Sequence, residues 1–152
     1  MATYANDYST GIENESIVFD VLKTIKGLKK LKKSKDRYCK YDFYNKKYEI
    51  ELKTRNNKFD MYPTTLMPVS KIRRDEDNNK TIIFMFKFKE YKDDIKKSIY
   101  YIKYDEEDFK DIVITRFKRK SRYGKVDYEE DYFNIPVKRL KCLYDLEGSK
   151  FN

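Results

Sequence analysis

Histidine is absent from this chain of 152 residues, and cysteine and glycine are rare. Without histidine the chain cannot form a Ser-His-Asp triad, a Cys-His dyad, an HNH-type nuclease site or most zinc sites. Two cysteines, Cys39 and Cys142, are too few for a disulfide framework, so we expect buried free thiols in a reducing compartment, cytoplasmic or nuclear. Four glycines leave no glycine-rich phosphate-binding loop. Any catalysis here must use carboxylates, lysine, tyrosine or a metal-bound water.

Long apolar runs are missing as well. The longest is the five-residue run 82–86, far below the roughly 20 apolar residues of a membrane span. No charged-then-apolar signal segment opens the sequence. We therefore expect no membrane partner, and an intracellular location. The length fits one domain, residues 1–152, with one continuous core.

Positive charge is in excess, with 35 basic against 26 acidic residues and a net charge of +9. That surplus suits a polyanion such as nucleic acid or an anionic membrane surface. The abundance of Lys, Tyr, Asn and Ile is also what an AT-rich genome produces, so codon bias is an alternative source of the bulk charge. The candidate phosphate-binding residues are Lys29, Lys30, Lys32, Lys33, Lys71, Lys118, Arg119, Lys120 and Arg122.

The first half of the sequence predicts a helix followed by a hairpin. Apolar residues at helical spacing from Ile12 to Leu28 indicate a helix that begins at Ser9 or Thr10 and ends within 27–33. Strands are expected at 37–44 and 47–54, joined by a turn at Asn45 and Lys46. Two prolines and two asparagines within 55–68 favour a loop, and 69–74 fits one or two helical turns.

The second half predicts further strands. We expect them at 81–89, with at least one buried face, at 98–104 and at 112–117. A short helix capped by Asp105 is expected over 105–109. Pro136 argues against a central strand within 132–143.

The most informative motif is Glu51-Leu52-Lys53 on the strand 47–54, with Asp42 on the strand before it. Side chains two residues apart share a strand face, so Glu51 and Lys53 lie about 6–7 Å apart along the strand. Two carboxylates can bind Mg²⁺ or Mn²⁺, and the carbonyl of Leu52 can complete the coordination. A neighbouring lysine can orient the attacking water or stabilise the charged transition state of phosphodiester hydrolysis.

An alternative interpretation is that Glu49, Glu51 and Lys53 form the solvated face of an ordinary amphipathic strand. Three other residues favour a site. Asp42 lies close enough in sequence for cross-strand proximity, Glu15 lies beside the apolar stripe of the first helix, and Lys71 follows the loop. Two of these residues have a simpler explanation. Glu15 can be an acid that is stabilised near a helix N-terminus, and Lys71 can be a surface lysine.

Together, Glu15, Asp42, Glu51-x-Lys53 and Lys71 resemble the PD-(D/E)xK nuclease superfamily, over roughly residues 11–89. The aromatic segments around 84–88 and 100–104 also resemble small nuclease-like proteins of large DNA viruses and phages. Membership would imply an α/β single domain with a mixed β-sheet flanked by helices around a restriction-endonuclease-like core. It would also imply a Mg²⁺- or Mn²⁺-dependent endonuclease or exonuclease acting on DNA, with RNA left open.

By this resemblance, Asp42, Glu51 and the Leu52 carbonyl would bind the metal, Lys53 would assist the water, and Glu15 would be the catalytic helix acid. Three features depart from the family pattern: Tyr41 replaces the proline, only a short turn separates Asp42 from the Glu51 strand, and no clear strand precedes Asp42.

Two rival functions remain open: an inactive nucleic-acid-binding module of the same fold, and a basic protein-interaction factor. Many superfamily members dimerise, and a homodimer of this chain would use 98–104 as an exposed edge strand.

Overall fold

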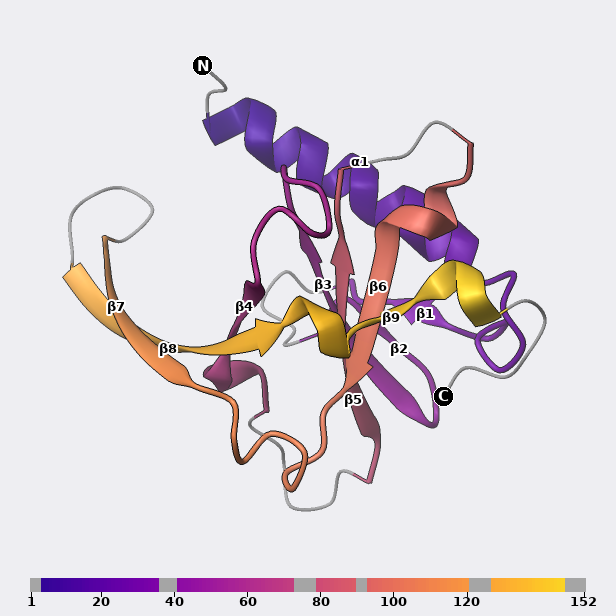
Figure 1. Cartoon of the computed structure of the whole chain (residues 1–152). Helices are drawn as coiled ribbons and strands as arrows, with labels where there is room; N and C mark the ends of the chain where they lie inside the picture. The colour runs from indigo at the N-terminus through magenta and orange to yellow at the C-terminus, as the bar shows by residue number, and fades with distance from the viewer. Residues whose placement is uncertain (1–3, 36–40, 73–78, 90–92, 121–126, 147–152) are drawn as a thin grey trace.

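A computed structural model describes residues 4–35, 41–72, 79–89, 93–120 and 127–146 (Figure 1). Its single α-helix, among these residues, is α1 (Tyr4–Leu22). The strands are β1 (Lys32–Lys33), β2 (Phe43–Tyr44), β3 (Tyr48–Thr54), β4 (Thr64–Pro68), β5 (Thr81–Lys87), β6 (Ile99–Lys103), β7 (Ile114–Lys120), β8 (Asp127–Pro136) and β9 (Lys141–Cys142). The 3₁₀ turns are η1 (Val69–Ile72), η2 (Ile95–Ser98), η3 (Val137–Arg139) and η4 (Leu143–Leu146).

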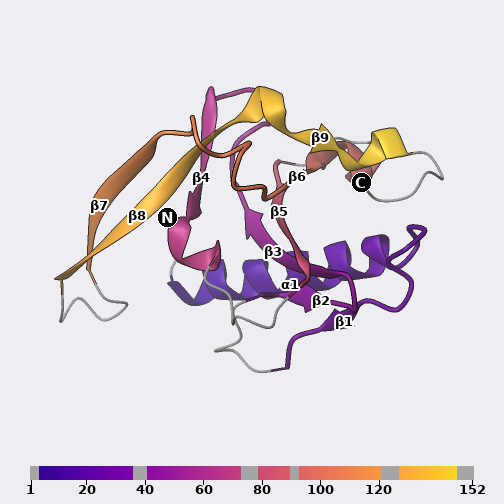
Figure 2. The same ribbon diagram turned by 90° about the horizontal axis from the view of Figure 1, so that it is seen from below.

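The described strands form two sheets. The larger has the order β1-β2-β3-β5-β6-β9, in which β3 and β5 run parallel and all other neighbours are antiparallel. The smaller has the order β4-β8-β7 and is antiparallel throughout. The mixed α/β class expected from the sequence is thus confirmed. Helix α1 lies across one face of the larger sheet (Figure 2), and the second sheet packs on the other face, where we expected a helix.

Strand β5 is apolar on both faces because a layer covers each of them. Ile83 and Met85 join the core beneath α1, with Val18 and Leu22 of the helix. The alternate residues, from Ile82 to Phe88, join the core between the two sheets. The expectation of at least one buried face at 81–89 is confirmed.

Helix α1 begins and ends earlier than predicted. Ser9 and Thr10 lie inside it, so neither is its first residue. After Leu22 the chain continues in tight turns, in which the N–H groups of Ile25 and Leu28 each donate three residues back. The apolar spacing continued beyond the helix because these turns keep Ile25 and Leu28 in the core beneath α1. The spacing identified Val18, Leu22, Ile25 and Leu28 correctly as buried, but Ile17 is 40% exposed and the predicted helix end was wrong.

The hairpin of β2 and β3 is confirmed, with the N–H of Asn45 donating to the Tyr48 carbonyl. Half of the first expected strand, residues 37–40 and Cys39 with them, lies outside the described residues, and of the other half only Phe43–Tyr44 is strand. The strand missing from the sequence pattern before Asp42 is β1, which has only two residues and pairs with β2. A strand this short carries no periodicity from which it could be predicted.

Four other expectations need correction. Residues 64–68 form β4 and not a loop. Strand β8 is the centre of the smaller sheet, and Pro136 is tolerated because it is the last residue of that strand. Strand β6 is not an edge, since Tyr100 and Tyr101 also pair with β9. Residues 105–109 form turns, although the Asp105 carboxylate does accept from two N–H groups, at 2.9 and 3.1 Å.

Cys142 is a free thiol that is half-buried, where we expected full burial, and burial raises its pKa. No helix in the described part of the chain is both long enough and apolar enough to span a bilayer.

Candidate active site

Asp42 occupies a bend just before β2. Phe43 pairs with Ile50, and the N–H of Asp42 donates to the carbonyl of the same Ile50, at 3.0 Å. Two consecutive residues thus oppose one residue of β3, which is the arrangement of a β-bulge. The bulge directs the Asp42 side chain along β3, past the residues that pair with β2, where its Oδ2 accepts the Leu52 N–H at 2.8 Å.

Glu51 and Lys53 share one face of β3, as the two-residue spacing predicted. The parallel register places Glu51 beside Phe84 and Lys53 beside Phe86, so both lie on the face that packs toward the second sheet. The Glu51 side chain is 6% exposed, and its Oε1 is 3.5 Å from the Nζ of Lys53. A buried carboxylate in this apolar layer needs cationic partners.

Lys71 supplies the second cation. It lies in η1, directly after β4 of the second sheet, and its Nζ is 3.2 Å from the same Glu51 Oε1. The Lys71 carbonyl accepts a hydrogen bond from the hydroxyl of Tyr41, at 2.5 Å. The expected helical segment at 69–74 is confirmed over its first residues as this 3₁₀ turn, and residues 73 and 74 lie outside the described part of the chain.

Glu15 reaches the same edge from α1. Burial, and then the charge of Asp42, raise the pKa of Glu15, while Lys33 of β1 acts in the opposite direction. The Nζ of Lys33 donates to the Ser16 hydroxyl at 3.0 Å, which fixes the ammonium beside the helix. The fold therefore brings Glu51, Lys53 and Lys71 into contact, couples Asp42 electrostatically to Glu51, and places Glu15 where the charge of Asp42 acts on it.

The two strand carboxyls are electrostatically coupled. Burial, and secondly the charge of Asp42, raise the pKa of Glu51 to about 7, against the lowering effect of Lys53 and Lys71. Burial also raises the pKa of Asp42, and the strongest opposing contribution is the hydrogen bond from the Leu52 N–H. Glu51 in turn lowers the pKa of Asp42, so each carboxyl affects the proton affinity of the other.

The donor set fits a small hard cation. It consists of two carboxylates and the Leu52 carbonyl, which points to the same side of β3 as the Leu52 N–H and therefore toward Asp42. Within the described ranges no three Asp, Glu, Cys or His side chains group as metal ligands. The remaining positions of a Mg²⁺ shell would fall to water, which that ion retains readily.

The other predicted phosphate-binding residues are divided between two places. Lys29, Lys30 and Lys32 lie around the hairpin end of β2 and β3. Lys118, Arg119 and Lys120 belong to β7, in the ribbon of β7 and β8 that projects away from β1 and β2 (Figure 1). Arg122 lies outside the described residues.

Sequence reasoning missed several basic residues near the hairpin. Lys26, Lys46, Lys47 and Lys80 gather there with the predicted cluster. The hairpin signal at Asn45 could have located Lys46 and Lys47. Lys80 could not have been placed, since its position follows from the parallel pairing of β3 with β5.

No protein-family model, curated protein or solved structure matches this chain.

Proposed function

We propose that the chain is a metal-dependent nuclease that hydrolyses phosphodiester bonds of DNA, built on a variant of the restriction-endonuclease-like core. The observation that carries this proposal is the convergence at the edge of β3. The charge of Asp42 helps to raise the pKa of Glu51, and two lysine ammonium groups lie 3.2 and 3.5 Å from Glu51 Oε1. A purely structural ion pair would not need two coupled acids, one in the bend before β2 and one on β3.

Asp42, Glu51 and the Leu52 carbonyl would hold Mg²⁺ or Mn²⁺, which supplies Lewis-acid activation of water and charge neutralisation at the phosphate. Lys53 is 31% exposed and so can contact both a solvent-derived nucleophile and Glu51. Its ammonium group would orient the attacking water and stabilise charge on the phosphate oxygens. Lys71, on the opposite layer, would hold Glu51 in place and balance its charge.

Glu15 would act from the helix side. Its half-buried carboxyl, beside Asp42 and Lys33, can accept a proton or a hydrogen bond from a water at the same edge. The residues of the site thus come from α1, the β2–β3 hairpin and η1.

The test is cleavage of labelled single- and double-stranded DNA with Mg²⁺, with Mn²⁺ and with EDTA. Wild type is compared with Asp42→Asn, Glu51→Gln and Lys53→Ala, and with Lys110→Ala as control, because Lys110 is an exposed lysine in the turn after β6. We expect metal-dependent cleavage by wild type and the control, and a loss of at least about 100-fold in the three site variants.

Three results would contradict the proposal. Equal cleavage by all proteins would indicate a contaminant. DNA binding without cleavage under any condition would favour the inactive module, and absence of DNA binding would favour the protein-interaction factor.

A further inference from the structure

Seven lysines surround one pocket of about 810 Å³ at the turn end of the hairpin. The segment from the end of α1 to β1 contributes Lys26, Lys29, Lys30 and Lys32. The hairpin turn contributes Lys46 and Lys47, and Lys80 precedes β5. Among the described residues no carboxylate lines this lysine pocket.

The pocket walls are held in place by hydrogen bonds. The Asn45 carboxamide oxygen accepts the N–H groups of Lys47 and Tyr48, at 2.8 and 2.7 Å, and its Nδ2 donates to the Gly27 carbonyl at 3.3 Å. Gly27 has a φ of 92°, which glycine adopts readily and other residues rarely do. One side chain therefore links the hairpin turn to the loop that follows α1.

Lys80 is positioned by the sheet. The Thr81 N–H donates to the Lys47 carbonyl at 2.9 Å, which brings the start of β5 to the hairpin turn. The Lys80 ammonium group lies 5.3 Å from the centroid of the Tyr44 ring, within the range of a cation–π interaction. The lysine pocket thus has an aromatic wall that helps to fix one of its charges.

The pocket and the candidate active site lie along the same face of the larger sheet. Lys32 pairs with Tyr44, and Tyr44 pairs with Glu49, which shares its face of β3 with Glu51. Glu51 lies four positions after Lys47, a rise of about 13 Å along a strand. A nucleic-acid strand advances about 3.4 Å per phosphate in a duplex, so this span corresponds to about four nucleotides.

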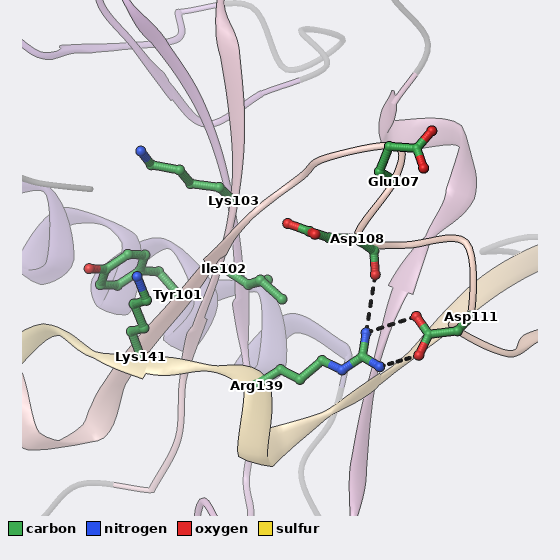
Figure 3. Close-up of a pocket in the computed structure, with 8 residues that line it drawn as sticks. All are labelled: Tyr101, Ile102, Lys103, Glu107, Asp108, Asp111, Arg139 and Lys141. Carbon is green, nitrogen blue, oxygen red and sulfur yellow. Dashed lines mark hydrogen bonds and ion pairs between the residues drawn. The ribbon is translucent and has the colours of Figure 1, made fainter.

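A second pocket, of about 630 Å³, shows what sets the lysine pocket apart. It lies between β6, the turn at 105–111 and β9, and it contains both signs of charge (Figure 3). Its Arg139 guanidinium is directed at the Asp111 carboxylate and the Asp108 carbonyl, so that cation is already paired. The described residues that line the lysine pocket include seven lysines and no carboxylate, a composition that favours an anion with several charges.

We propose that the lysine pocket binds the phosphate backbone of the nucleic-acid strand whose scissile bond lies at Asp42 and Glu51. The assignment of the strand as a substrate rests on the proposed function, whereas the binding itself does not. Repeated phosphates at fixed spacing match seven lysines across a concave surface better than a single small anion does. The pocket would then determine how the strand is placed relative to the cleavage site.

The test uses the full chain carrying Asp42→Asn, in EDTA, so that binding is measured without cleavage. Fluorescence anisotropy follows a labelled 20-nucleotide single strand over a range of salt concentrations. In the triple variant Lys29→Ala, Lys30→Ala and Lys47→Ala, we expect at least a tenfold loss of affinity near 0.1 M salt. The slope of log affinity against log salt should fall by about two to three, close to one counterion for each lysine removed.

The matched control removes the same charge elsewhere, through Lys103→Ala, Lys110→Ala and Lys141→Ala, two of which line the second pocket. This variant should retain affinity within about threefold, and melting curves establish that both triple variants are folded. Equal losses in the two triples would overturn the proposal, because only bulk charge would then matter. The proposal would also be overturned if the pocket triple weakened binding to polyglutamate or to phosphatidylserine vesicles more than it weakened binding to the oligonucleotide.

Cleavage assays separate the two proposals, with the pocket triple made in the chain that keeps the native Asp42. With a functional enzyme, the pocket triple should raise KM at least tenfold and leave kcat within about twofold. Cleavage by wild type with unchanged binding in the pocket triple would refute the pocket assignment alone. Selective loss of binding in the pocket triple, with no cleavage by any protein, would refute the nuclease function and leave the pocket supported.

Discussion

Asp42 and Glu51 are electrostatically coupled, and the charge of Asp42 helps to raise the pKa of Glu51 to about 7, although an isolated pair of carboxylates would both be negative near neutral pH. Burial is the larger cause of this rise, and Lys53 and Lys71 oppose it. Loss of the Glu51 proton, or its replacement by a bound cation, should therefore change the stability of the protein measurably.

Stability without metal should fall as pH rises. An acid whose pKa is raised by folding stabilises the folded state below its unfolded pKa, here 4.5, and loses that contribution as pH passes about 7. For Glu51 this amounts to at most about 3 kcal/mol. Glu51→Gln mimics the protonated state, so its stability relative to wild type should increase by that order between pH 5 and pH 8. Urea unfolding in EDTA measures this difference, and parallel pH profiles would contradict the assignment.

Divalent cations should reverse that loss at pH 8. A ligand that binds only the folded state at 100 times its Kd adds about 2.7 kcal/mol. We expect Mg²⁺ or Mn²⁺ to raise the melting temperature of wild type, and to leave Asp42→Asn and Glu51→Gln within about 1 °C of their EDTA values. Differential scanning fluorimetry is sufficient, with Lys110→Ala as the control. An equal rise in all four proteins would mean that the cation binds elsewhere.

Lys71 should mainly affect the pH dependence of stability, and Lys53 should mainly affect kcat. Lys71 is the nearer cation, at 3.2 Å from Glu51 Oε1, and it is anchored on a separate layer. Lys71→Met should therefore move the pH midpoint of the Glu51-dependent stability change upward, since a lowering influence on the Glu51 pKa is removed. Lys53→Met should have the larger effect on kcat, about 100-fold or more, as expected for a group that contacts the reacting atoms. Equal effects of both variants on both quantities would contradict this division.

The interface between the two sheets should be sensitive to loss of volume. Phe84 is fully buried there, beside the rings of Tyr104, Phe109 and Phe133. Phe84→Ala should lower the free energy of unfolding by about 3–5 kcal/mol. Phe117→Ala removes a ring that is 37% exposed and should cost less than half as much. Urea unfolding compares the two, and similar losses would indicate that the inter-sheet core is not a major source of stability.

Much of the candidate site could be predicted from the sequence because its information is local. Glu51 and Lys53 share a strand face by the two-residue period alone, and Asp42 lies one short hairpin away. The bulge that turns the Asp42 side chain toward Leu52 could not be read from residue types, since it depends on which N–H groups share the Ile50 carbonyl.

The second sheet was the main feature that the sequence did not predict. Prolines and asparagines made 55–68 look like a loop, but its last five residues pair with β8, about 70 residues later. Such pairing is determined by tertiary packing and not by local propensity. Lys71 was singled out from the sequence, but its ion pair with Glu51 was not predicted. That contact forms because β4 belongs to the second sheet and places η1 opposite β3.

The ion pair between Lys71 and Glu51 is also a bond between the two layers of the molecule, since one residue follows β4 and the other lies in β3. A sliding motion of one sheet over the other by a few ångströms would break it. The chemistry of the site is thereby coupled to the alignment of the layers: a misaligned molecule would lose the charge balance at Glu51 before it lost its fold.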